Sequence, residues 1–181
     1  MLKSIFIFIV SVVGIPIYAV CVVFLLVIGT LFGWSYVDAS VYICEYSQPI
    51  ITALLALCFL ISAIRNKLKG FNNKSSGVRL LLSAICLIYI SIITYCTYEF
   101  IHRVIEYLGM TNPQIFDFVV QELSKMGDMY PKGRINLFTG ESISYGYIMA
   151  NMEVYILPIS IVLLCGLIQW RIGKRMKINR Q

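Results

Sequence analysis

The stretch "SYVDASVYICEYSQPI", residues 35–50, connects two long apolar runs. A looser copy, "SYGYIMANMEVYILPI", residues 144–159, precedes the last apolar run of the chain. At a constant offset of 109 residues the two copies share five residues: Ser35 and Ser144, Tyr36 and Tyr145, Tyr46 and Tyr155, Pro49 and Pro158, and Ile50 and Ile159. The pattern favours an internal repeat of two tandem helical hairpins in an all-α protein. Chance similarity between apolar segments is the alternative.

Composition indicates that the chain belongs in a lipid bilayer. It is 59% hydrophobic and only 13% charged, with a mean hydropathy of +0.82. A soluble domain of this size carries about twice that charged fraction, and about 20 apolar residues suffice to cross a bilayer. The sequence therefore predicts a polytopic membrane protein, a four-transmembrane-helix bundle forming a single membrane domain over residues 1–181. The predicted spans are 5–33, 43–65, 80–100 and 149–171.

Charge predicts the orientation of these spans. Eleven of the 15 basic residues are Lys3, Arg65, Arg171 or members of a loop at 66–79 and a tail at 172–181, and these segments contain no acid. All nine acids lie in or beside the other connections. Because Lys and Arg near span ends favour the cytoplasm, we expect both termini to be cytoplasmic in a plasma (inner) membrane. Contact with anionic lipids accounts for the net charge of +6 without a nucleic-acid partner.

The connection between the third and fourth spans, residues 101–147, is predicted to form an extracytoplasmic helical cap. Within it, residues 113–126 form an amphipathic helix, with Asn112 as its N-cap and Pro113 in the first position. Its apolar face consists of Ile115, Phe116, Val119, Val120, Leu123 and Met126. We expect this helix to rest on the outer membrane surface or on top of the bundle. The residues after it, rich in glycine and proline, predict a loop.

Chain length and a four-span topology resemble the DsbB family of quinone-linked disulfide oxidoreductases. The resemblance implies a cysteine pair in each outer connection. Here the first outer connection contains only Cys44 and the second contains none, so no redox activity is carried over. The other five cysteines lie in apolar runs, where cysteine behaves as a small hydrophobe. His102 is the single histidine, and no catalytic, metal or cofactor site is predicted.

Two groups of residues are candidates for function. The first is a candidate functional surface at the outer side of the membrane: Glu45, Glu99, His102, Arg103, Glu106, Phe116, Val120 and Arg134. Within it, Glu99 with Arg103 and His102 with Glu106 have the spacing of ion pairs along a helix. The second group is a row of hydroxyl side chains along one face of the third span: Ser83, Ser91, Thr94 and Tyr98. Such a row either lines a pore in an oligomer or packs against another helix.

The sequence leaves three functions open. The leading hypothesis is a non-enzymatic membrane protein that acts by protein–protein contact, as an accessory subunit, a toxin-immunity protein or a defence-associated protein. Its partners are the lipid bilayer and either a second protein or a further copy of the chain. The alternative is a homo-oligomeric channel. The third is a membrane enzyme acting on lipid or quinone through Glu45, Glu99, His102 or Glu153.

Overall fold

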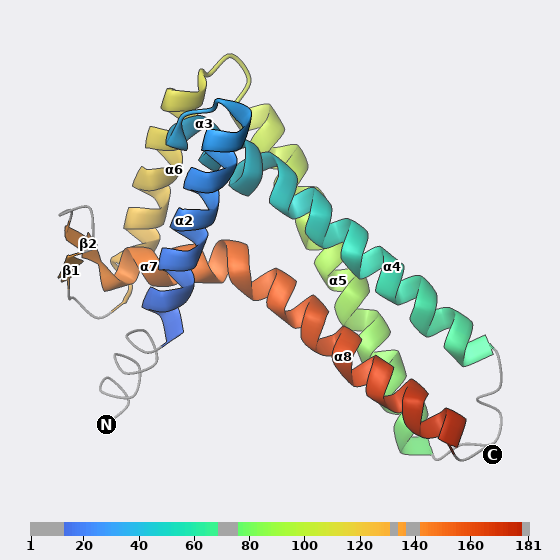
Figure 1. Ribbon diagram of the computed structural model, residues 1–181. Coiled ribbons are helices and arrows are strands. Elements are labelled where there is room, and N and C mark those ends of the chain that lie inside the picture. The colour runs from blue at the N-terminus through green and yellow to red at the C-terminus, as the bar shows by residue number, and fades with distance from the viewer. Residues whose placement is uncertain (1–12, 69–75, 131–133, 137–141, 179–181) are drawn as a thin grey trace. The chain divides into compact units, whose positions relative to one another are not determined.

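The computed structural model describes residues 13–68, 76–130, 134–136 and 142–178 (Figure 1). Parts of several predicted segments lie outside these ranges: residues 5–12 of the first span, 69–75 of the loop, 131–133 and 137–141 of the cap, and 179–181 of the tail. The chain divides into two compact units. Unit 1 comprises Met1–Tyr46 and Glu106–Leu157, and unit 2 comprises Ser47–Ile105 and Pro158–Gln181.

The described chain is nearly all helical, and four of its helices are long and apolar enough to cross a membrane. They are Ile15–Phe32, Tyr36–Arg65, Leu80–Glu106 and Tyr145–Lys174. This confirms the prediction of an all-α protein with four such helices. The second and fourth begin upstream of the predicted starts at residues 43 and 149, because Ser35 and Ser144 cap them. Each serine hydroxyl accepts a hydrogen bond, at 3.1 Å, from the backbone N–H three residues later.

The two copies of the repeated stretch share one order of elements: a serine cap, a short α-helix, a π-helical segment and a long α-helix. In the first copy these are α3 (Tyr36–Ser40), η2 (Val41–Ser47) and α4 (Gln48–Leu68), and in the second α7 (Tyr145–Asn151), η4 (Met152–Ile156) and α8 (Leu157–Ile178). Both long helices begin one residue before the matched prolines, Pro49 and Pro158. Proline lacks an N–H and its ring clashes with the carbonyl four residues earlier. A widened π-helical turn upstream of each proline relieves that clash.

Unit 2 consists of α4, α8 and most of α5 (Ser76–Glu106). Its core cluster is Ala56, Ile85, Tyr89, Val162 and Cys165. Gly166 of α8 packs closely against the ring of Phe59. A Cβ atom on residue 166 would lie 2.7 Å from a carbon of that ring. The Tyr89 hydroxyl donates to Oε1 of Gln169 at 3.3 Å inside this core. The buried polar groups of unit 2 therefore include a neutral pair on two helices.

Unit 1 contains α2 (Ile15–Phe32), α3, α6 (Asn112–Gly127) and α7. The N-cap of α6 is Thr111 rather than the predicted Asn112. Oε1 of Gln114 accepts from the Thr111 backbone N–H at 2.8 Å, which closes the first turn. Because Thr111 takes that place, the Asn112 side chain is used elsewhere, and its Nδ2 donates to Oδ1 of Asp38 at 2.7 Å. This bond ties the start of α6 to α3.

The end of α6 meets the start of α7 through two glycines. A Cβ on Gly146 would lie 2.1 Å from the carbonyl oxygen of Gly127, and a Cβ on Gly127 would lie 2.8 Å from the backbone of Gly146. Only residues without a side chain allow the two backbones to come this close. Further along α7, the ring of Tyr147 packs edge-on against Tyr18 of α2, with 6.4 Å between the ring centroids.

These contacts place α6 beside α2, running in the opposite direction (Figure 1). The apolar residues Ile115 and Leu123 of α6 are buried, whereas Asp117, Gln121 and Lys125 are exposed. The helix is therefore amphipathic, as the sequence predicts. Its apolar face, however, points into unit 1 alongside α2.

The segment after α6 differs from the predicted loop by a short antiparallel pair of strands. These are β1 (Arg134–Asn136) and β2 (Ser142–Ser144), with Ile135 opposite Ile143. The tight Asn-Gly or Asp-Gly turn that signals a hairpin in a sequence is missing between them. β2 leads directly into the serine cap of α7, so the pair fixes the approach to that helix.

Candidate functional site

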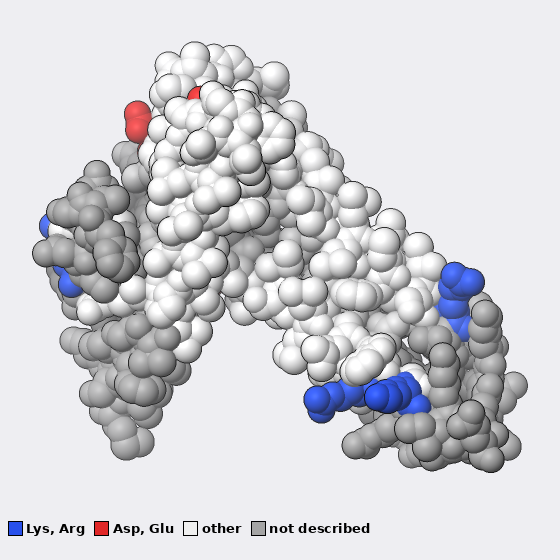
Figure 2. Space-filling model, viewed as in Figure 1, with Lys and Arg blue, Asp and Glu red and all other residues white. Residues whose placement is uncertain are grey.

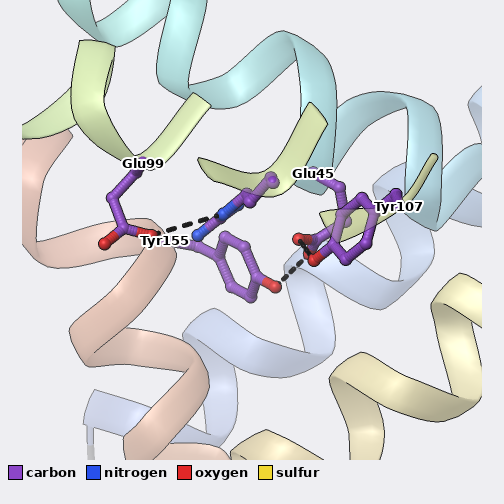
Figure 3. A network of polar contacts seen from close by, with 5 residues as sticks. Glu45, Glu99, Tyr107 and Tyr155 are labelled. Carbon is purple, nitrogen blue, oxygen red and sulfur yellow. Dashed lines mark hydrogen bonds and ion pairs between the residues drawn. The ribbon is translucent and has the colours of Figure 1, made fainter. Parts of the chain in front are cut away.

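The most unusual side chain of unit 1 is Glu45, a carboxylate that is only 3% exposed. The sequence places it on an outer surface, but the structure places it inside the unit, in the π-helical segment η2. Its Oε2 accepts a hydrogen bond from the Tyr107 hydroxyl at 3.0 Å, and its Oε1 accepts one from the Tyr155 hydroxyl (Figure 3). A carboxylate enters a protein interior at an acceptable free energy only when such donors replace water. Among the described residues, Glu45 is the one buried acid.

Both copies of the repeated stretch contribute to this site. Glu45 lies in the π-helical segment of the first copy, and Tyr155 lies in that of the second. The residue of the first copy that matches Tyr155 is Tyr46, which packs against the Tyr107 ring instead. π-Helical segments occur frequently at functional sites, because the extra residue turns a side chain in a new direction. The two copies of the repeated stretch thus meet at one carboxylate, which the first copy supplies and to which the second copy donates a hydrogen bond.

A cavity of about 90 Å³ lies beside Glu45, entirely within unit 1. Residues from α2, α3, η2, α6, α7 and η4 line it, among them five aromatic rings: Tyr18, Tyr36, Phe116, Tyr147 and Tyr155. Val120, another member of the predicted outer surface, lines the cavity as well. Among the described residues of the lining, Glu45 is the only charged one. The described part of the lining is therefore rich in aromatic rings and carries a single acidic side chain.

The other members of the predicted surface are divided between the units. In unit 2, the predicted pair of Glu99 and Arg103 is present, with Nε of the arginine 3.5 Å from Oε2 of the glutamate. Arg103 is 8% exposed, and Glu99 appears in Figure 3. His102 is exposed, and its ring lies 5.9 Å from that of Tyr98. In unit 1, Glu106 and Arg134 are exposed, and Arg134 lies on β1.

The predicted row of hydroxyl residues lies on α5, away from the core of unit 2. Ser91, Thr94 and Tyr98 are exposed and Ser83 is half-buried, whereas Ile85 and Tyr89 on the other side of the helix are buried. The Thr94 hydroxyl donates to the carbonyl of Ile90 on its own helix at 2.9 Å. The row shares its face with apolar side chains such as Leu87, which is 65% exposed. It does not line the interior of this unit and could meet lipid or a second chain.

The acids proposed for catalysis make specific contacts in the structure. In the described ranges no three His, Cys, Asp or Glu side chains are grouped closely enough to hold a metal ion. The Glu153 carboxylate accepts a hydrogen bond from the Tyr130 hydroxyl. That bond, together with burial and the nearby negative charge, raises the pKa of Tyr130 to about 12. Of the four residues proposed for catalysis, Glu45 and Glu153 therefore accept hydrogen bonds from tyrosine hydroxyls. Glu99 forms an ion pair with Arg103.

The sequence predicted Glu45 as a candidate but missed the tyrosines around it. Tyr36 and Tyr155 follow the pattern of rings at a membrane interface, which also fits headgroup contact. The repeat was the available signal, since it aligns Tyr155 with the segment that carries Glu45. No protein-family model, curated protein or solved structure matches this chain. We therefore infer function from the residues of the chain itself.

Proposed function

We propose that this chain is a non-enzymatic multi-pass protein of the plasma (inner) membrane that acts by contact with a partner protein. Accessory-subunit, immunity and defence-associated roles all belong to this class. Unit 2 serves as the anchor in the bilayer, and unit 1 meets the partner. The observation that carries the proposal is the difference between the surroundings that α2 and α6 require.

Helix α2 is apolar on all sides, and its exposed residues include Val20, Val23 and Leu31, which are 58 to 72% exposed. Lipid is the natural neighbour for such a surface. Beside it, α6 exposes Asp117, Gln121 and Lys125. A charged side chain facing lipid at the bilayer centre costs about 2.5–3.5 kcal/mol on insertion scales. If α2 crosses the membrane, the polar face of α6 needs water or protein next to it, and a partner subunit supplies such a surface.

The distribution of charge indicates which charge the surface of a partner should carry. The ranges of unit 1 contain eight of the nine acids, and those of unit 2 contain 11 of the 15 basic residues. Figure 2 shows Lys and Arg gathered near the ends of α4 and α8. By the preference of basic residues for the cytoplasm, these ends and both termini are cytoplasmic. An acidic unit 1 then favours a partner with a basic surface.

Site-specific photo-crosslinking in cells tests the proposal. A photoreactive residue at Gln121 on the polar face of α6 is expected to give one discrete protein adduct. The same residue at Val23, on the apolar face of α2, is the matched control and should react with lipid. An adduct of twice the chain's mass would identify a second copy as the partner. Absence of any protein adduct from position 121, with normal expression, would refute the proposal.

The channel alternative rests on the exposed hydroxyl row of α5. It requires several copies to bring Ser91 and Thr94 together around a pore, although Thr94 already bonds to its own backbone. Purified protein in planar bilayers should then conduct. A photoreactive residue at Ser91 distinguishes the two functions, since a channel gives a self-adduct there and a lipid-facing row does not.

A further inference from the structure

We propose that the cavity beside Glu45 is a binding site for a small neutral aromatic molecule, a single ring of about the size of benzene. Such a site is separate from the partner contact proposed above, because its ligand lies inside unit 1. Three features of the described lining support it: the hydrogen bonds that its polar side chains already make, its pairs of aromatic rings, and the size of the space.

Polar side chains in the described lining already have hydrogen-bond partners. The Glu45 carboxylate accepts hydrogen bonds from the Tyr107 and Tyr155 hydroxyls. Nδ2 of Asn151 donates to the backbone carbonyl of Tyr147 at 2.9 Å. Within the described part of the chain, no buried side-chain nitrogen or oxygen lacks a hydrogen-bond partner. Because buried water and buried ions bind where polar groups need partners, such a lining favours a neutral, apolar ligand.

Two pairs of aromatic residues contribute to the walls of the cavity. Tyr18 and Tyr147 meet edge to face, with 6.4 Å between their ring centroids. Tyr36 and Phe116 meet in the same way, with 6.1 Å between theirs. Aromatic rings attract one another in edge-to-face and offset-stacked arrangements more strongly than their buried area alone accounts for. The walls therefore favour a flat aromatic ligand over an aliphatic one of the same size.

The cavity has room for a single ring. Its volume of about 90 Å³ holds roughly six to nine groups of the size of water, since each needs about 10–15 Å³ by this measure. Spaces between helices that are lined mainly by apolar and aromatic side chains are common sites for such ligands. One wall belongs to α2, whose Val20 and Val23 are exposed. If α2 faces lipid, as proposed above, an apolar ligand is concentrated beside this wall.

Photolabelling of the purified full-length chain in nanodiscs with phenyl azide tests the site. On illumination this probe reacts with the groups around it, and mass spectrometry locates the adducts. We expect adducts on residues of the cavity lining. Benzene should suppress them at a bilayer concentration about two- to tenfold lower than cyclohexane requires, the range that attraction between aromatic rings predicts.

Val22→Phe and Val23→Phe form a matched pair on α2. Val22 lines the cavity, whereas Val23 is 58% exposed and is not part of the lining. A phenylalanine at position 22 fills the space, so labelling of the lining should be lost, and the same residue at position 23 should leave it unchanged. Circular dichroism checks that both variants fold.

Three results would overturn the proposal. They are native protein whose cavity lining is not labelled, cyclohexane that competes as well as benzene, and unchanged labelling of the lining in folded Val22→Phe. Because the first two use the native chain, they decide between the outcomes even if Val22→Phe does not fold.

Discussion

The buried tyrosine hydroxyls of units 1 and 2 donate to acceptors of different charge, a carboxylate in unit 1 and an amide in unit 2. In unit 2 the phenol of Tyr89 donates to Gln169, whose amide in turn donates to the carbonyl of Phe59 at 3.4 Å. This neutral pair links helices in the manner usual inside membranes. Unit 1 instead buries the Glu45 carboxylate beside a cavity. Because a buried carboxylate is much harder to desolvate than an amide, packing alone does not account for it, and we look for function in unit 1.

The largest expected effect concerns the glycine contact in unit 1. Gly146→Ala would place a Cβ 2.1 Å from a backbone oxygen of Gly127, and no side-chain rotation relieves that clash. We expect a loss of more than about 3 kcal/mol of unfolding free energy, at the upper end for overpacking. Denaturation in detergent followed by circular dichroism measures it. Gly173→Ala is the matched control, with no atom within 4 Å, and should change the stability by less than about 0.5 kcal/mol.

The corresponding change in unit 2 should be milder. Gly166→Ala would place a Cβ 2.7 Å from the Phe59 ring, and a side chain can move where a backbone cannot. We expect a loss of about 1–3 kcal/mol, measured by the same denaturation. Phe59→Leu in the same chain should recover part of it by vacating the ring position. If the double variant is simply the sum of the two single ones, the contact is not the cause.

Removal of one phenol hydroxyl from each unit compares the two polar sites directly. Tyr107→Phe takes a donor from a carboxylate and should cost about 1.5–3 kcal/mol, the range for hydrogen bonds to charged groups. Tyr89→Phe takes a donor from an amide and should cost about 0.6 kcal/mol, the average for such bonds between membrane helices. Denaturation of the two variants under identical conditions gives the ratio. Equal losses would contradict the distinction between the units.

The smallest effect is the pH dependence of the Tyr130 contact. Its pKa rises from 10 to about 12 in the folded chain, chiefly because its hydroxyl donates to Glu153. The folded state therefore keeps a proton that the unfolded state loses, so this stabilisation is complete below pH 10 and is lost as pH rises through about 12. Tyr130→Phe should flatten that part of the stability curve, measured by unfolding midpoints across this range. Parallel curves for both proteins would show that the contact contributes nothing.

Local patterns predicted the helices, because run length and helical periodicity are local properties. The amphipathic face of residues 113–126 is an example, and its buried members include Ile115 and Leu123. The burial of Glu45 could not be predicted in this way. Its partners, Tyr107 and Tyr155, lie 62 and 110 residues further along the chain. The π-helical segments could not be predicted either. They result from the need to fit a proline into a packed helix, and no single residue type signals that need.

By the proposed function, unit 1 has two kinds of surroundings, lipid along α2 and a polar medium along α6. Nitroxide labels at Val23, Gln121 and Ser91, in separate variants reconstituted in nanodiscs, test it by collision with oxygen and with a water-soluble nickel complex. Oxygen concentrates in lipid and the nickel complex in water. We expect oxygen to dominate at positions 23 and 91 and the nickel complex to dominate at position 121. Oxygen dominance at all three positions would contradict it, because the polar face of α6 would then lie against lipid.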